Sequence, residues 1–375
     1  MLRIPLHVKE FASQRPELFE QFMDYWRHYR FQETKDAKYE YQKTRKDGSV
    51  ITFEEKEAEM HETLMAEVNL RAGFIAGQTD GMSAEALSTM PTLRWAAFAI
   101  VGMLIDVAIP DVIIDSIGLY TEVRNAGFGD SFAFDIMPRD LWTVSKHGRA
   151  QRHAEVQKQH SGQVTIIPEN RELTVQVSLY KVLAGKESLA RFVSKAILSL
   201  EAELTKDVYT VFNTAMAALA TSPAATALQV TGWTLDSFLG LAEKVSAWNG
   251  GAKPILVGTP RALASVLPND VNYRYDIDSE FVKIGYMRTI SGYDIMSLPQ
   301  VANYTTPFEV VLTNERLYVI SPGVDKLVKL GLEGSTTSHV DAVNSNANLT
   351  INATFNKSWG AAIATSAIAG TIDIS

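Results

Sequence analysis

The residues best suited to chemistry are few, and their spacing fits no common active site. Residues 125–130 read NAGFGD and hold Gly127 and Gly129, but Phe132 stands where a dinucleotide-binding G-x-G-x-x-G pattern needs its third glycine. No helical pattern follows these glycines, so we expect a turn at the edge of a strand. The chain also has no P-loop, H-E-x-x-H or G-x-S-x-G pattern.

Three histidines, His147, His153 and His160, lie in one polar segment at intervals of six and seven residues. A metal site needs side chains on one face, four residues apart on a helix or two apart on a strand. We therefore expect exposed or interface histidines. His61 shares a helical face with Leu64 and should be packed rather than catalytic. The sequence thus predicts no enzyme, no catalytic residue, no metal site and no cofactor.

The composition is that of an ordinary globular protein. The 375 residues are 46% hydrophobic and 21% charged, with a net charge of −8 and no cysteine. The acidic balance argues against a protein that grips nucleic acid, and the lack of cysteine excludes thiolate chemistry and disulfides. Residues 1–9 lack the apolar core of a secretory signal. The longest apolar run, residues 95–105, is too short to span a bilayer and predicts a buried helix, so we expect no membrane partner.

A polar, basic segment lies between alternating strand patterns. Residues 127–136, 164–167 and 173–179 alternate as half-buried strands, and we expect them to form an extended two-stranded arm with a polar tip. An isolated hairpin is marginal in water, so the arm should rest on a partner. Trp142 is expected to be an exposed interface anchor. The candidates for contacts between subunits are Arg139, Trp142, Lys146, Arg149, Arg152 and Lys158.

A long amphipathic helix follows the arm. Residues 186–220 contain no glycine or proline, and their apolar residues recur with the period of one buried stripe. A helix of that length spans about 50 Å. Beyond it, helix and strand patterns alternate, with Thr234 as the N-cap of a helix that ends at Trp248. We expect an α+β domain there, and Trp95 and Trp233 should be core residues.

The first 90 residues are polar and charged but contain short amphipathic helices. Pro16–Phe31 has one apolar face, and Thr52 with Glu55 forms a capping box before a second helix. A hairpin is expected at residues 43–53, around Asp47. Helices this short need a surface to lie on. We expect the segment to be retained as a clamp on the main body or on a neighbouring subunit.

The order of these parts resembles the HK97-like major capsid proteins of tailed bacteriophages. The resemblance covers residues from about 110 to 375 and depends on element order, on GDSFAFDI and on LTVQVSLYKVLAGKESLARFVSKAILSLEAEL. It implies an α+β fold with an N-terminal arm, an extended two-stranded loop, a long spine helix and an axial α+β domain. The implied parts are an N-terminal arm at 1–90, the start of a peripheral domain at 91–128, an extended loop at 129–182, the spine helix at 183–220, an axial domain at 221–340 and a return to the peripheral domain at 341–375.

The resemblance also implies a function. A capsid protein self-assembles into hexamers and pentamers, and these form an icosahedral shell around double-stranded DNA without reading its sequence. Portal, scaffold and decoration proteins would be its other partners, and it would be found in the virion after assembly in the host cytoplasm. Two alternatives stay open: an encapsulin-type compartment of the same fold that encloses a cargo enzyme, and a soluble α+β enzyme. The long N-terminal arm argues against the first, and the lack of an acid/base or nucleophile constellation argues against the second.

Overall fold

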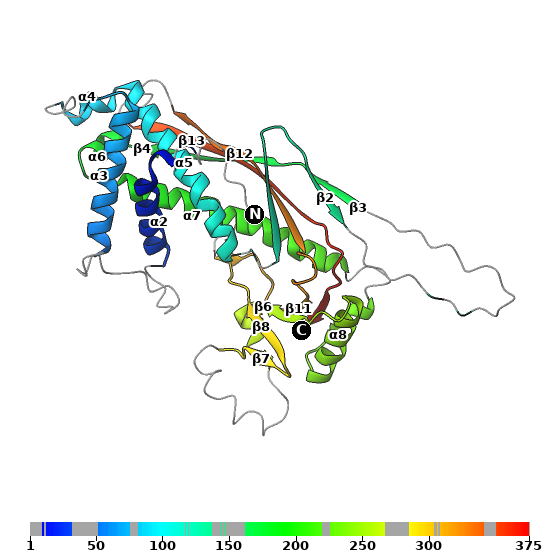
Figure 1. Cartoon of the computed structure of the whole chain (residues 1–375). Helices are drawn as coiled ribbons and strands as arrows, with labels where there is room; N and C mark the ends of the chain where they lie inside the picture. The colour runs from blue at the N-terminus through cyan, green and yellow to red at the C-terminus, as the bar shows by residue number, and fades with distance from the viewer. Residues whose placement is uncertain are drawn as a thin grey trace.

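The computed structural model describes residues 10, 13–31, 52–75, 82–116, 118, 120–136, 144, 146, 162–219, 226–266, 285–303, 306, 308–340 and 350–374. Two large sheets, two small two-stranded sheets and the helices that pack on them make up this part of the chain (Figure 1). The helices are α2 (Pro16–Phe31), α3 (Phe53–Arg71), α4 (Ala84–Ser88), α5 (Pro91–Ser116), α6 (Leu179–Leu183), α7 (Leu189–Leu219), α8 (Leu235–Trp248) and α9 (Pro260–Leu263), with a 3₁₀ turn, η2, at Thr226–Leu228. The predicted mixed α+β class is confirmed.

Four strands form the sheet beside α5 and α7. Their order is β1 (Thr121–Ala126), β12 (Val328–Val340), β13 (Ile351–Ile363) and β4 (Glu169–Val177). β1 runs parallel to β12, and the other neighbours are antiparallel. A short hairpin of β2 (Phe132–Ile136) and β3 (Gly162–Ile166) extends from this sheet, with Phe132 opposite Ile166.

A second sheet of six strands lies below the first in Figure 1, together with α8 and α9. Its strands follow the order β5, β14, β11, β6, β8 and β7. Their bounds are β5 (Gln229–Thr231), β14 (Gly370–Asp373), β11 (Arg316–Ile320), β6 (Ile255–Gly258), β8 (Tyr293–Ser297) and β7 (Thr289–Ile290), and β9 (Ala302–Asn303) pairs with β10 (Glu309–Val310) apart from them. The expected helix 234–248 is α8, and Thr234 is its N-cap.

The long helix expected over residues 186–220 is α7, Leu189–Leu219. Its apolar stripe is buried against α5, β12 and β13, and Val193, Ile197 and Leu200 are at most 6% exposed. The far end of the helix reaches the second sheet, where the Phe212 ring meets Tyr318 edge-on at 4.7 Å. Asn213 donates to the Val311 carbonyl at 3.2 Å and accepts from the Tyr318 hydroxyl at 3.0 Å. One helix therefore contacts both sheets.

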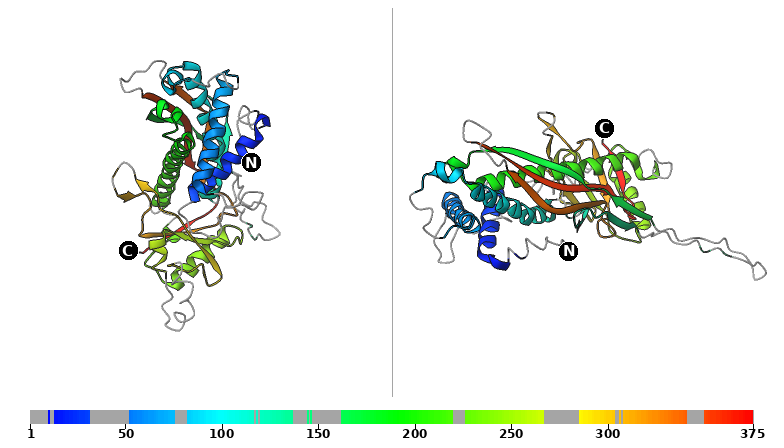
Figure 2. Two further views of the ribbon diagram at one scale, coloured as in Figure 1. Left: turned by 90° about the vertical axis from the view of Figure 1, so that its left-hand side faces the viewer. Right: turned by 90° about the horizontal axis from the view of Figure 1, so that it is seen from above.

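The N-terminal helices lie on the body of their own chain. α2 has the predicted bounds, and the capping box of Thr52 and Glu55 is present at the start of α3. Phe22 and Trp26 of α2 and Met60 of α3 are fully buried in the same core as α5 and α7. Both views of Figure 2 show this helical pair beside α5. The hairpin expected at residues 43–53 lies almost wholly outside the described residues.

The structure corrects two local expectations. The buried helix predicted over residues 95–105 is longer than its apolar run, because it begins at Pro91 and continues through Pro110 to Ser116; Ile109 and Ile113 on either side of the proline are buried. Trp95, expected in the core, is 65% exposed at the start of the same helix. Trp233 is half-buried and packs on the ring of Phe238, with centroids 5.5 Å apart.

Strand pairing also departs from the expected arm. The strand expected at 173–179 is not part of the hairpin, because β4 pairs with β13 over Glu169–Val177 and a helix begins at Leu179. The chain does not pass from the six-stranded sheet to the four-stranded one at residue 340, where the predicted axial domain ends. Val328–Val340 already belongs to the four-stranded sheet, and Gly370–Asp373 returns to the six-stranded one.

Truncation of the α7 stripe should destabilise the whole subunit. We expect Leu200→Ala to lower the free energy of unfolding by about 2–5 kcal/mol, because it deletes a buried side chain that the surrounding sheet and helices cannot fully replace. Lys195→Ala, at an exposed position of the same helix, is the matched control. The measurement is denaturant unfolding followed by circular dichroism. Equal midpoints for the two variants would mean that this face does not stabilise the fold.

Candidate assembly surface

The hairpin of β2 and β3 is the described part of the predicted arm, and its base is fixed to its own subunit. Phe132, Phe134 and Ile166 form a small buried cluster on the four-stranded sheet. The close approach depends on two glycines of that sheet. A Cβ on Gly331 would lie 2.6 Å from the Phe132 ring, and one on Gly360 would lie 2.7 Å from the Ile166 side chain. The base of the arm therefore packs on its own subunit, and contact of the arm with a neighbouring subunit stays a prediction.

Arg124 of β1 strengthens the same anchor. Its guanidinium lies 4.4 Å from the centre of the Phe134 ring and donates to the Ala133 carbonyl at 2.9 Å. A cation over an aromatic face and a charged hydrogen bond hold the hairpin at a set angle to the sheet. Figure 1 and the right-hand view of Figure 2 place β2 and β3 at the end of the molecule opposite α3.

Large apolar side chains are exposed around the hairpin. Phe128, in the turn before β2, is 88% exposed, and Ile167 after β3 is 80% exposed. Single exposed apolar residues are ordinary, but two at the base of one projecting element suit a contact surface. Sequence reasoning did not single out Phe128 and Ile167, although both lie within the predicted strand segments 127–136 and 164–167.

One of the six predicted contact residues lies within the described part of the chain. Lys146 is exposed and lies outside any helix or strand. The other five candidates lie outside the described residues: Arg139, Trp142, Arg149, Arg152 and Lys158. Their role at subunit contacts stays a prediction.

The glycines of residues 125–130 form the turn that sequence reasoning expected. Gly127 and Gly129 lie between β1 and β2, and the Asp130 carboxylate accepts from the Gly127 amide at 3.1 Å. Gly129 has a φ of 83°, which favours glycine, and its amide donates to Glu333 at 2.6 Å. This turn directs the chain from the sheet into the hairpin.

His61 is packed, as expected. Its Nδ1 accepts a hydrogen bond from the Leu189 amide at 3.2 Å, so it caps the first turn of α7. Burial lowers the pKa of His61, which keeps the ring neutral and able to accept. His147, His153 and His160 lie outside the described residues. Among the described residues no group of three His, Cys, Asp or Glu side chains could hold a metal ion.

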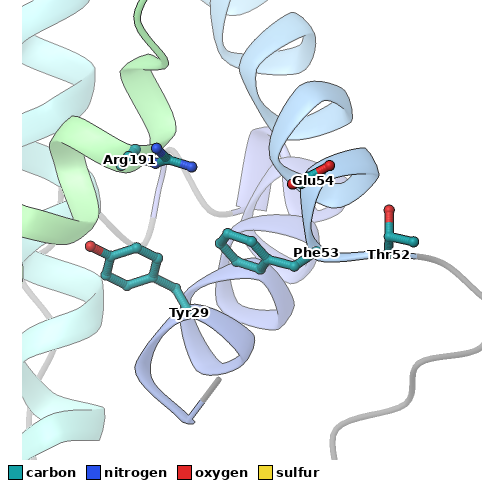
Figure 3. A pocket seen from close by; sticks show the side chains of 5 residues that line it. All are labelled: Tyr29, Thr52, Phe53, Glu54 and Arg191. Atoms are coloured by element: carbon teal, nitrogen blue, oxygen red, sulfur yellow. The ribbon is translucent and has the colours of Figure 1, made fainter. Parts of the chain in front are cut away.

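An open pocket of about 610 Å³ lies where α2 ends and α3 begins (Figure 3). It is lined by Tyr29, Thr52, Phe53, Glu54 and Arg191. Arg191 of α7 is already engaged, because it donates to the buried Glu57 at 2.6 Å. Figure 3 shows the Tyr29 and Phe53 rings side by side, and their centroids are 6.0 Å apart. The pocket thus offers aromatic surface and a paired charge, and these features do not form a nucleophile or acid/base constellation.

Ion pairs join the N-terminal helices to α7. Arg30 at the end of α2 donates to Glu201 at 2.6 Å, and both side chains are less than 15% exposed. Together with the Arg191–Glu57 pair, this contact joins each helix of the N-terminal pair to the same rod. Partly buried, hydrogen-bonded pairs are directional, so they set the register of α2 and α3 on α7.

Among the described residues, one stretch of helix, Pro91–Pro110 of α5, is long and apolar enough to cross a membrane. However, 78% of this stretch is buried inside the protein. A core helix of a soluble protein gives the same result. The burial matches the expectation of a buried helix over residues 95–105.

A buried ion pair fixes α5 to the four-stranded sheet. Lys357 of β13 donates to Asp106 of α5 at 2.7 Å and to the Gly334 carbonyl at 2.9 Å. The amide and hydroxyl of Thr336 also donate to Asp106. The side chains of Lys357 and Asp106 are 5% and 1% exposed. A register shift in the pairing of β12 with β13, between Glu333 and Thr337, brings Thr336 to the carboxylate.

The chain is similar to known proteins in structure but matches none of them by sequence. No protein-family model matches the chain, and no curated protein matches it. A mature capsid of bacteriophage PhiM1 aligns at a TM-score of 0.43 and 11% identity, over 68% of this chain and 85% of that one. A capsid of the cyanophage P-SCSP1u aligns at 0.45 and 12%, over 70% and 87%. A capsid of an empty GTA particle aligns at 0.46 and 11%, over 69% and 89%. Since these TM-scores lie below 0.5, the function proposed below rests on the geometry of this chain.

Removal of one partner of the buried pair should cost more than removal of both. Lys357→Met leaves the Asp106 charge buried and short of a partner, and we expect a loss of about 3–5 kcal/mol in the free energy of unfolding. The double variant Asp106→Leu with Lys357→Met should recover part of that loss, because no buried charge remains. Denaturant unfolding of the double variant and of the two single variants, Lys357→Met and Asp106→Leu, measures the difference. If the double variant loses the sum of the two single losses, the two groups do not interact.

Proposed function

We propose that the chain is the major capsid protein of a tailed bacteriophage, the repeating subunit of an icosahedral shell. The observation that carries the proposal is the hairpin of β2 and β3. It is anchored on its own sheet, projects at the end opposite α3 and is flanked by exposed Phe128 and Ile167. A rigidly based projection with apolar flanks suits contact with a neighbouring copy.

The order of elements supports the same proposal. A hairpin, a long helix, a second sheet with its own helices and a returning strand follow one another in the order that the HK97-like resemblance implies. Copies that contact head to tail, with one end against the other end of the next subunit, form rings when the rotation closes. On this proposal the rings are hexamers and pentamers, which together close the shell.

Further partners belong to the same proposal. The shell encloses double-stranded DNA without sequence-specific contacts. The net charge of −8 disfavours tight binding to the DNA phosphates, because such binding depends on cationic groups that displace counterions. Portal, scaffold and decoration proteins are its other partners. Assembly takes place in the host cytoplasm, and the product is the virion.

Charge reversal in the predicted arm should block assembly. We expect the triple variant Arg139→Glu, Arg149→Glu, Arg152→Glu to remain folded by circular dichroism but to yield no shells or capsomers, because each lost contact is repeated in every subunit. A matched control carries the same charge change at the exposed positions Lys195, Lys244 and Arg261. Sedimentation velocity and negative-stain electron microscopy of purified protein are the measurements.

The outcomes separate the parts of the proposal. Shells from the control but not from the arm variant support the arm contact. Normal shells from the arm variant would refute that contact and leave the shell proposal standing. A wild-type chain that stays monomeric at every salt and protein concentration would refute the shell itself. Native particles that carry a cargo protein and no nucleic-acid absorbance would identify an encapsulin-type compartment instead.

The N-terminal helices should remain in the mature subunit. Phe22, Trp26 and Met60 fill the core over α5 and α7, so loss of this segment would expose a broad apolar surface of the body. We expect mature particles to contain the full chain of 41.4 kDa by intact mass spectrometry. A mature mass that lacks residues 1–80 would identify the segment as a processed scaffold.

A further inference from the structure

Two described connectors carry the chain between the sheets. Residues 321–327 lead from β11 of the six-stranded sheet to β12 of the four-stranded one, and residues 364–369 lead from β13 back to β14. Neither connector is a helix or a strand. The angle between the sheets therefore depends on what holds these connectors.

Asn249, at the end of α8, holds both connectors at once. Its Oδ1 accepts from the Ile368 amide at 2.9 Å, and its Nδ2 donates to the Ile368 carbonyl at 2.8 Å. The same Nδ2 lies 3.3 Å from the hydroxyl of Ser321 in the other connector. Asn249 is 4% exposed, so these bonds form away from competing water. The side-chain amide of Asn249 thus links the two connectors by hydrogen bonds of the kind that a neighbouring strand would make.

Asp325 joins the same two connectors at their other end. Its Oδ2 accepts from the Ser366 amide at 3.1 Å, and its Oδ1 accepts from Lys329 at 2.6 Å. Lys329 is 4% exposed at its side chain and also donates to Glu122 of β1 at 2.7 Å. A continuous series of hydrogen bonds therefore joins Glu122 of β1 to Lys329, Lys329 to Asp325, and Asp325 to the Ser366 amide.

We propose that Asn249 and Asp325 form a polar brace that locks the two connectors together, and that acid releases its Asp325 half. The brace does not rest on the proposed shell function. α7 also joins the two sheets, through apolar contact of Phe212 with Tyr318 that carries no charge. Loss of the brace should therefore loosen the connectors while the sheets stay joined along α7.

The charges around Asp325 give the sign of the acid effect. Burial works to raise the pKa of Asp325, but hydrogen bonds from Lys329 and the Ser366 amide outweigh it and hold the pKa below its ordinary value. Glu122 behaves alike, because bonds from Lys329 and Arg124 outweigh burial and lower its pKa. Lys326 donates to the Gly118 carbonyl and is the remaining charge next to Asp325 in the first connector. A depressed carboxylate pKa stabilises the fold above about pH 4, and this stability is lost as pH falls through the folded-state pKa.

Hydrogen exchange measured by mass spectrometry on the full chain tests the brace. We expect Asn249→Ala to speed exchange of residues 364–369 by about tenfold, since it removes the acceptor of the Ile368 amide. We expect Asp325→Asn to speed exchange at Ser366, because one neutral amide oxygen replaces the two carboxylate oxygens that accept from Ser366 and Lys329. Asn249→Asp, which keeps an acceptor for the Ile368 amide but sets a carboxylate against the Ile368 carbonyl, is the second variant. Asp294→Asn is the matched control, because it breaks the exposed pair with Lys253 without reaching a connector.

Acidification separates the brace from general loosening. On lowering the pH from 7 to about 2.5, well below the ordinary aspartate pKa of about 3.9, wild-type residues 364–369 should lose protection relative to the core of β12, after correction for intrinsic exchange. Asp325→Asn should show no such change, because its side chain does not titrate. Connector exchange at wild-type rates in all three brace variants would overturn the proposal. So would an equal acid response in wild type and Asp325→Asn.

Discussion

Burial of one face of α7 is the constraint on which the other contacts of the subunit depend. The helix lies against β12 and β13, contacts α2, α3 and α5 and reaches Tyr318 of the second sheet. Most of the stability of a helix in a protein comes from packing of its apolar face, and the sheet alone would expose its inner face. Each element therefore stabilises the others through the same rod.

This arrangement explains how one chain can present contact surfaces at two distant ends. The hairpin is fixed to β12 and β13 at Gly331 and Gly360, and both strands pack on α7. The N-terminal helices are fixed to α7 through Arg30 and Arg191. The two ends of the described part of the subunit are therefore joined through one buried helix.

The sequence predicted the elements whose signals are local. Periodicity located α7, proline and apolar spacing located α2, and Thr52 and Thr234 marked the starts of two helices. Strand alternation located β2, but it could not tell that β4 pairs with β13 rather than within the arm, because pairing depends on residues far along the chain. β12 was missed altogether, since Gly331 and Gly334 interrupt its alternation and neither glycine is a usual strand residue.

Long-range polar contacts were beyond reach for the same reason. Lys357 and Asp106 are separated by 251 positions, and neither stands in a pattern that marks it as buried. The exposure of Trp95 reverses a rule that holds for most tryptophans in apolar helices: it lies on the outer face of a turn whose Leu93 and Ala96 are buried. Of the arm, sequence reasoning identified the strands β2 and β3, the role of its basic residues stays a prediction, and the glycine-dependent anchor of its base emerged only from the fold.

The most direct test of the account is native-state hydrogen exchange along α7 in the full chain. If one buried helix supports both ends, amides from Val193 to Phe212 should share nearly the same high protection and open together. The account predicts that Leu200→Ala lowers protection at both ends of the helix by a similar factor. Exchange in which the half that contacts α3 opens independently of the half that contacts Tyr318 would contradict the claim of a single supporting rod.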